Sequence, residues 1–172
     1  MLKMFFKANA LLTLVFFLSL LMIPVISMAQ ANKAAMDGSF ITGDLCGLWT
    51  DARWQQEFTA MKNAGMHYII LASVAESFPG KVTITIYPSS LPNTEMAKGE
   101  NGVTYPDIVD ACLRNAQKAG IKVFIGIDAN NRWWESPAND STWFYSQMSL
   151  DNNICDELWK NYKSKYPDTF YG

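Results

Sequence analysis

The sequence predicts an α/β fold in which parallel strands alternate with helices. The main observation is a repeat: the pattern of residues 62–70 recurs in form at residues 117–125, an offset of 55 residues. Each copy joins a helix end to an Ala-Gly turn and then to a continuous apolar run, which suits a strand buried on both faces. Two such units in series give β-α-β-α-β connectivity, and therefore a parallel sheet with right-handed crossovers.

The first unit begins with a short predicted strand over residues 39–42, which Gly43 is expected to end. Thr50 can cap the helix that follows, and Gly65 ends it. Its apolar residues fall at helical spacing, namely Trp54, Phe58 and Met61. Residues 67–72 form the apolar run of the second strand.

The middle of the chain predicts one half-buried strand and one loop. Residues 81–87 alternate Val82, Ile84 and Ile86 with lysine and threonines, the period of a strand with one solvent face. Residues 88–102 are rich in Pro, Ser, Asn and Gly and predict a loop.

The second unit predicts a helix over residues 105–119 with Gly120 as its stop, and a buried strand over residues 121–127. A long helix follows over residues 141–166, and a further strand begins at residues 169–172. This helix is expected to turn inward Trp143, Ile154, Leu158 and Tyr162. The run Trp143-Phe144-Tyr145 with Met148 is expected in the core, and the solvent face is expected to hold Asp151, Asp156 and Glu157.

The first 29 residues predict a secretory signal peptide. Lys3 and Lys7 precede an apolar run over residues 10–26, and Ser27-Met28-Ala29 forms a small-residue cleavage site. An uncleaved membrane anchor is the competing interpretation, which the helix-breaking Pro24 disfavours. Residues 30–37 predict a linker and residues 38–172 the folded part. We therefore expect a secreted or periplasmic protein without stable membrane association after cleavage.

Charge and cysteine content exclude several classes of ligand. Without Lys3 and Lys7 the 14 basic side chains become 12, against 16 acidic ones, a net charge of −4. This balance argues against nucleic acid as a partner and favours an uncharged or weakly polar ligand. Neither a GxGxxG nor a P-loop pattern follows a strand, so no cofactor is predicted. Cys46, Cys112 and Cys155 indicate neither a metal site nor a disulfide framework, and leave open one bridge or free thiols.

Polar and aromatic residues follow the predicted strands, at the edge where parallel α/β proteins bind ligands. Carboxylates and amides beside flat aromatic rings are the composition of a carbohydrate cleft. The predicted substrate-binding residues are Asp44, Trp49, Glu76, Asp128, Asn130, Trp133 and Trp134. Glu76 and Asp128 are weighed as a catalytic pair, but solvated loop acids are the more common case. His67 and Ser73 give little support for a catalytic triad, so the catalytic residues stay unassigned.

Several of these segments resemble a bacterial family of exported glycosidase-like (β/α)8 barrels known only as a domain of unknown function. The resemblance spans residues 39–172. It is carried by Phe40-Ile41-Thr42-Gly43, Met61-Lys62-Asn63-Ala64-Gly65, Tyr87-Pro88-Ser89, Val123-Phe124-Ile125-Gly126-Ile127 and Trp133-Trp134. It implies the first half of a TIM barrel, truncated here, and a sugar-directed function. It also implies an acid/base and a nucleophile after strands 4 and 7, regions that this sequence does not contain.

Two kinds of function therefore remain open from the sequence. One is the amino-terminal part of a glycoside-hydrolase-like barrel that acts on or binds carbohydrate, inactive as this chain alone. The alternative is a non-catalytic carbohydrate-binding half-barrel, or one that self-associates through its unfinished sheet, or else a truncated open reading frame.

Overall fold

The computed structural model describes residues 37–172 except 79, 131 and 133–139, and of Asp44 the backbone alone. The predicted leader and most of the predicted linker lie outside the described residues. Residues Gly38–Gly172 form one unit. Its elements are β1 (Gly38–Thr42), α2 (Gly43–Cys46), α3 (Asp51–Asn63), β2 (Tyr68–Ala72), β3 (Ala75–Glu76), β4 (Thr83–Thr85), β5 (Thr94–Met96), α4 (Ile108–Ala119), β6 (Lys122–Ile125), β7 (Asp128–Ala129), α6 (Ser141–Leu158) and the π-helical turn η2 (Trp159–Lys163).

The main sheet is parallel, as predicted, with strand order β1-β2-β6. The chain end continues this order, because Phe170 forms a parallel bridge with Val123 on the free side of β6. Backbone hydrogen bonds on either side of the bridge join Tyr171 N to Val123 O at 2.8 Å and Val123 N to Thr169 O at 2.7 Å. The predicted fourth strand therefore begins where the sequence placed it.

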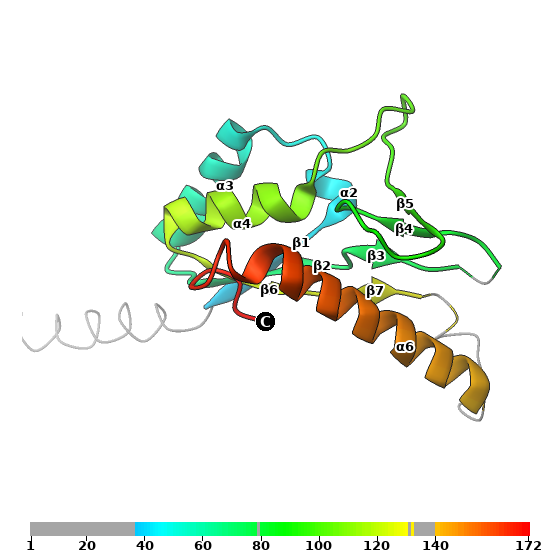
Figure 1. Ribbon diagram of the computed structural model, residues 1–172. Coiled ribbons are helices and arrows are strands. Elements are labelled where there is room, and N and C mark those ends of the chain that lie inside the picture. Colours follow the sequence, from blue (N-terminus) through cyan, green and yellow to red (C-terminus); the bar gives the residue numbers. More distant parts are fainter. Residues whose placement is uncertain (1–36, 79, 131, 133–139) are drawn as a thin grey trace, which may run out of the picture. The chain divides into compact units, whose positions relative to one another are not determined.

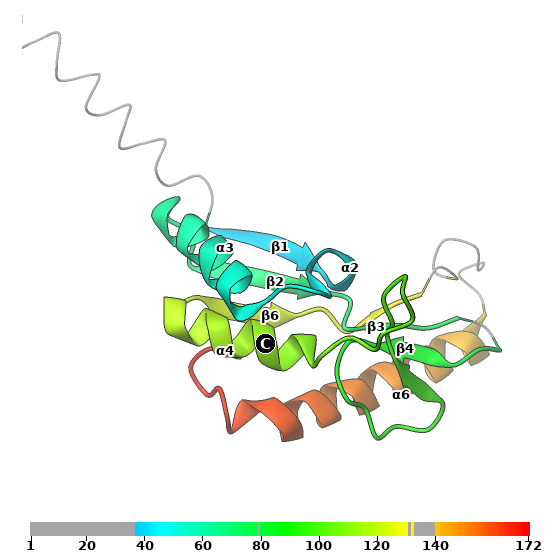
Figure 2. The ribbon, with the colours of Figure 1, turned by 90° about the horizontal axis from the view of Figure 1, so that it is seen from above.

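Helices cover one face of this sheet (Figures 1 and 2). Trp54 and Phe58 of α3 are buried, as is most of the inward side of α4. The covered face of the sheet buries Ile41, Ile69, Leu71, Val123 and Ile125. Because side chains alternate along a strand, Phe40, Ile70 and Phe124 point to the opposite face, where they are exposed. One face of the sheet thus forms the core with α3 and α4.

The helix ends confirm the local signals in the sequence. Thr50 accepts a hydrogen bond from Arg53 N at the start of α3. Asp107 accepts one from Asp110 N at the start of α4, three residues later than the predicted start. Gly120 ends α4 with φ +70°, a left-handed conformation that glycine adopts without a steric penalty.

A second sheet, with order β5-β4-β3-β7, extends the ends of β2 and β6. The sequence predicts none of β3, β5 and β7. The alternation predicted over residues 81–87 is confirmed for Ile86, which is buried, but within β4 itself the threonines are the buried side chains. Thr83 and Thr85 are buried, whereas Val82 is exposed. Burial of Thr85 is tolerated because its hydroxyl donates to Tyr87 O at 2.8 Å, which satisfies the polar group.

In the long helix, the side chains that are buried and exposed differ in part from those predicted. Phe144, Tyr145 and Met148 are exposed, so the expected core position is wrong for these three residues, and Trp143 is half-buried. Ile154, Leu158 and Tyr162 are buried as predicted. Glu157 is also buried rather than solvated, because polar groups of residues 87–90 donate hydrogen bonds to its carboxylate. Helical periodicity identifies sides of a helix, but the partner packed against each side decides which one is buried.

Candidate functional site

A hollow of about 180 Å³ lies at the carboxyl ends of β1 and β2, which we call the strand-end hollow. Thr42 and Ala72, the last residues of these strands, lie on the same sheet face as Phe40 and Ile70. Small residues keep the hollow open, and Glu76 is the only carboxylate among the described residues that line it. The lining comprises Thr42, Gly43, Ala72, Ser73, Val74, Ala75, Glu76, Ile84, Ile86, Ala97 and Ala129.

Ser73 occupies a strained backbone conformation at the rim of this hollow. Its φ is +56°, a region that residues with a Cβ atom seldom adopt. The neighbouring strand approaches closely there, since a Cβ atom on Gly126 would lie 3.0 Å from Ser73 N. Val74 N donates to Gly126 O at 2.9 Å directly after the irregularity. Strand pairing therefore resumes beyond Ser73, as β3 against β7.

Ser73→Gly is expected to keep or raise stability, whereas Ser73→Val is expected to lower it by about 1–2 kcal/mol, because a β-branched side chain is disfavoured at positive φ. Urea denaturation of the two variants beside the parent measures this difference. Equal stability of the glycine and valine variants would show that Ser73 is not strained.

Side chains alternate between the two faces of a sheet along each strand, and this alternation separates the predicted pair Glu76 and Asp128. In the β3–β7 pair Glu76 is opposite Ala129, and Asp128 is opposite Ala75. Glu76 and Ala129 line the strand-end hollow, whereas Asp128 contacts Gln147 of α6. The two carboxylates thus lie on opposite faces, and the structure does not bring them together as a catalytic pair.

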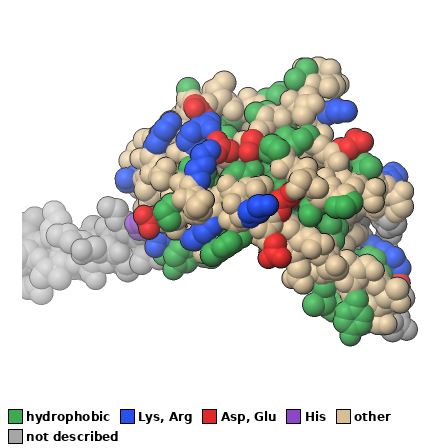
Figure 3. Space-filling view, in the orientation of Figure 1, with side chains coloured by type: hydrophobic (Ala, Val, Ile, Leu, Met, Phe, Trp, Pro, Cys, Tyr) green, Lys and Arg blue, Asp and Glu red, His purple; other side chains and the backbone are tan. Residues whose placement is uncertain are grey.

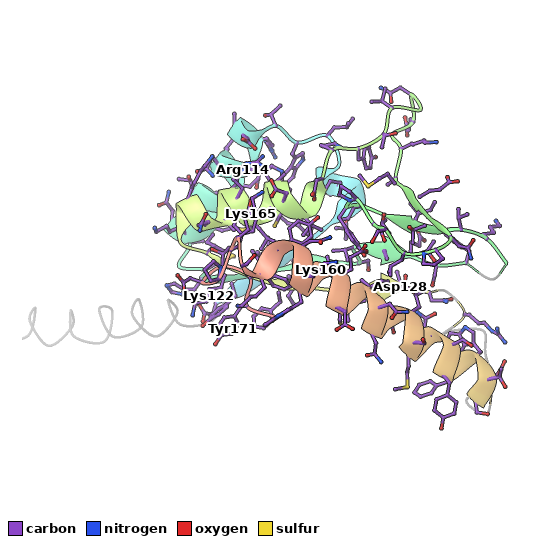
Figure 4. All side chains as sticks on the ribbon, viewed as in Figure 1. Arg114, Lys122, Asp128, Lys160, Lys165 and Tyr171 are labelled. Atoms are coloured by element: carbon purple, nitrogen blue, oxygen red, sulfur yellow. The ribbon has the colours of Figure 1, made fainter. Side chains whose placement is uncertain are left out.

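Asp128 belongs to a hydrogen-bonded cluster between the β3–β7 pair and α6 (Figure 4). Its Oδ2 accepts from Ser77 Oγ at 2.5 Å and from Gln147 Nε2 at 2.6 Å. Asn130 Nδ2 donates to Ser77 Oγ at 3.0 Å and to Gln147 Oε1 at 2.8 Å. Gln147 also donates to Asp151, whose carboxyl pKa is raised by burial and by the charge of Asp128. This cluster fixes α6 to the strand ends, a positioning role.

A second, helix-side hollow of about 200 Å³ adjoins this cluster and is lined in part by Ser77, Asn130 and Gln147. Arg132 lines it as well, forms an ion pair with Asp140, and lies 5.3 Å from the centre of the Trp143 ring. Because the Arg132 cation is already paired and stacked, the groups that remain to bind a small ligand in the helix-side hollow are amides and hydroxyls.

The family model described as "Domain of unknown function (DUF4434)" matches residues 36–172. The chain belongs to this family. Among curated proteins, none matches it.

One similar solved structure is a provisionally assigned alpha-L-fucosidase from Bacteroides thetaiotaomicron VPI-5482, with a TM-score of 0.58 and 26% identity. The match covers 80% of this chain but 39% of that chain. Another is an alpha-L-fucosidase from Bacteroides thetaiotaomicron, with a TM-score of 0.41 and 18% identity over 73% of this chain and 27% of that one. The match to the first of these structures confirms the predicted fold: this DUF4434 chain has the glycosidase-like α/β fold with parallel strands, and it spans about two fifths of that structure.

The remaining predicted site residues of the DUF4434 chain divide into two groups. Trp133, Trp134 and the side chain of Asp44 lie outside the described residues. Trp49 is half-buried and packs edge-on against Trp54, with ring centres 4.9 Å apart. Arg53 lies 5.4 Å from the centre of the Trp49 ring. The contacts of Trp49 are therefore those of a packing residue.

Sequence reasoning missed Ser77 and Gln147, which complete the Asp128 cluster. They lie 51 and 19 residues from Asp128 in the chain, so no local pattern connects them. In the described part of the chain, no group of three or more His, Cys, Asp or Glu side chains could hold a metal ion. Cys46 and Cys112 are buried, Cys155 is exposed, and burial raises the pKa of the Cys112 thiol. No helix within the described residues is long and apolar enough to cross a membrane.

Proposed function

We propose that this chain forms part of an exported glycosidase-like barrel that binds a neutral carbohydrate at the strand-end hollow. The observation that carries the proposal is the position of Glu76. It lines a hollow at the carboxyl ends of parallel strands, the edge at which TIM-barrel enzymes form their sites. The similarity to a provisionally assigned alpha-L-fucosidase supports a sugar as the ligand.

The chemistry of the lining suits hydroxyl groups rather than ions. The Glu76 carboxylate can accept hydrogen bonds from two sugar hydroxyls, and the Ser73 and Thr42 hydroxyls can both donate and accept. Among the described residues no lysine or arginine lines this hollow, so an anionic sugar would meet a carboxylate without a compensating cation. A neutral glycan, with fucosides as the first to test, fits this arrangement best.

Binding is proposed in preference to hydrolysis for the part of the chain that the structure describes. Glycoside hydrolysis by most families uses two carboxyl groups, roughly 5 to 9.5 Å apart. Glu76 is the single carboxylate that the described lining residues supply. A longer barrel that brings a second carboxylate opposite Glu76 would add hydrolysis, which is the alternative function.

Glu76→Gln is expected to weaken glycan binding by about 10- to 100-fold, because the substitution replaces charged hydrogen bonds by neutral ones. A glycan array identifies the ligand, with L-fucose and 4-nitrophenyl α-L-fucoside as the first probes in solution, and calorimetry measures the affinity. Glu100→Gln is the matched control, since Glu100 is exposed and lies outside the hollow.

Two outcomes would contradict the proposal. The parent chain could bind no glycan on the array, or Glu76→Gln could bind with the affinity of the parent. Release of 4-nitrophenol by the parent chain would instead support the hydrolytic alternative.

A further inference from the structure

The second sheet carries two carboxylates on one of its faces. Glu76 of β3 is opposite Ile84 of β4, and Ile84 is in turn opposite Glu95 of β5. Residues that pair directly across neighbouring strands turn their side chains to the same face of a sheet. Glu76, Ile84 and Glu95 therefore form one row across three strands, which Figure 1 shows next to one another.

This row lies on the face of the second sheet that contains the strand-end hollow. Glu76 and Ile84 line the hollow, and so does Ala97, which follows Glu95 by two residues. Asp128 and its contact with α6 lie on the opposite face. Glu95 thus borders the hollow, next to two of its lining residues, without being part of the lining itself.

Both carboxylates are available to a ligand. Glu76 and Glu95 are exposed, and among the described residues neither side chain has a hydrogen-bond or ion-pair partner. Ile84 lies between them, half-buried, and gives the row an apolar centre. An apolar floor with an acceptor on each side suits a sugar, because its C–H groups pack on the floor while its hydroxyl groups donate to the carboxylates.

The separation of the two carboxylates indicates the length of the ligand. Neighbouring strands lie about 4.8 Å apart, so the Cα atoms of Glu76 and Glu95, two strands apart, are separated by roughly 10 Å. Each unit of a pyranose chain advances by about the width of one strand. A single sugar in the hollow therefore contacts Glu76 alone, whereas two linked units reach from Glu76 to Glu95.

We propose that the site takes an oligosaccharide, which runs from the strand-end hollow across β4 to β5, and that Glu95 binds its second unit. This inference rests on the proposed function, because it uses the same hollow and the same Glu76. It adds the class of ligand: a neutral oligosaccharide of two or more units is bound in preference to a single sugar.

The test compares a monosaccharide with an oligosaccharide that carries the same sugar at its non-reducing end. The probes are L-fucose and the trisaccharide 2′-fucosyllactose, and calorimetry measures the affinity of the full chain for each. The parent should bind the trisaccharide about 10-fold more tightly than L-fucose. Glu95→Gln should remove about this factor for the trisaccharide and leave L-fucose binding unchanged, because it replaces charged hydrogen bonds by neutral ones at the second unit alone. Glu76→Gln should weaken the binding of both probes.

An aromatic surface on α6 is the competing contact for the second unit. Figure 3 shows hydrophobic side chains gathered at the beginning of α6, at the lower right, where Phe144, Tyr145 and Met148 are exposed. Exposed aromatic rings also pack on sugars. Because α6 contacts the opposite face of the second sheet, Tyr145→Ala should bind both probes as the parent does. Glu100→Gln is the matched control for charge, since Glu100 is exposed but lies outside the row.

Three results would overturn this inference while the proposed function stands. Glu95→Gln could bind the trisaccharide with the affinity of the parent, the parent could bind L-fucose as tightly as the trisaccharide, or Tyr145→Ala could lose the affinity that Glu95→Gln keeps. Binding of neither probe would overturn the inference as well. The glycan array separates the two failures, because absence of binding to every glycan contradicts the proposed function itself.

Discussion

Glu157→Ala is expected to lower the free energy of unfolding by about 3 kcal/mol, because it removes the charged acceptor of four hydrogen bonds and leaves the buried Tyr87 hydroxyl without a partner for its proton. The Glu157 carboxylate accepts from Tyr87 Oη at 3.0 Å, from Ser89 Oγ at 2.6 Å, and from both N and Oγ of Ser90 at 2.6 Å. These bonds join α6 to the loop after β4. The Tyr87-Pro88-Ser89 segment, part of the family resemblance, thus has a structural role.

Urea denaturation of the parent and the variant measures this effect. Asp156→Ala is the matched control, because Asp156 precedes Glu157 on the same helix but is exposed. It should change the stability by less than about 0.5 kcal/mol. If both alanine variants lose the same stability, the effect comes from the helix and not from the hydrogen bonds to residues 87–90.

The pH dependence of stability gives the same prediction a second readout. Burial alone would raise the pKa of Glu157, but the hydrogen bonds from Ser89, Ser90 and Tyr87 outweigh it, so the pKa lies below its ordinary value. A carboxyl with a lowered folded-state pKa stabilises the fold fully above its unfolded value of about 4.3. This contribution is lost as pH falls from there through the folded pKa. Glu157→Gln should therefore differ most from the parent near neutral pH, and least in acid.

Trp54→Ala is expected to cost about 3–5 kcal/mol of stability, the range for a large buried aromatic side chain replaced by alanine. Trp54 is 1% exposed and stacks on Phe58, with ring centres 5.4 Å apart. Trp49 packs against its edge, so the substitution removes the contact between α3 and the segment that precedes it. Thermal and urea unfolding, followed by circular dichroism, measure the loss.

The exposed tryptophan of η2 supplies the control for this experiment. Trp159 is 58% exposed, and its ring lies 6.0 Å from that of Phe170. Trp159→Ala should therefore cost about 1 kcal/mol or less. Comparable losses at the two positions would contradict the assignment of Trp54 to the core.

The sequence was most informative where structure depends on neighbouring residues. Thr50 and Gly120 act at helix ends through hydrogen bonds to residues close by in the chain, so the local sequence reveals them. The two Ala-Gly turns and their apolar runs likewise predicted β2 and β6 and their parallel pairing. A short strand such as β3 escaped, because two residues carry no period that a pattern can detect.

The sequence predicted which strand ends carry the candidate site residues, but not the face of the sheet to which each side chain points. The sequence placed Glu76 and Asp128 at adjacent strand ends, and β3 and β7 do pair there. The pairing of the two segments shifts by one residue next to Ser73 and Gly126: Leu71 pairs with Ile125, an offset of 54 residues, whereas Ala75 pairs with Asp128, an offset of 53. A shift of one residue reverses the face of every side chain that follows, and no local pattern reports such a shift.

What the sequence alone determined is the order of the units, the direction of their strands and the edge at which Glu76 and Asp128 lie. These follow from periodicity and capping, which act over a few residues. Only the tertiary structure decided that Glu76 lines the strand-end hollow while Asp128 fixes α6, and that Glu157 is buried. It also decided that Phe40, Ile70 and Phe124 form an exposed row. The physical reason is that burial and hydrogen bonding depend on which distant segment lies opposite each side chain, and that partner is set by packing.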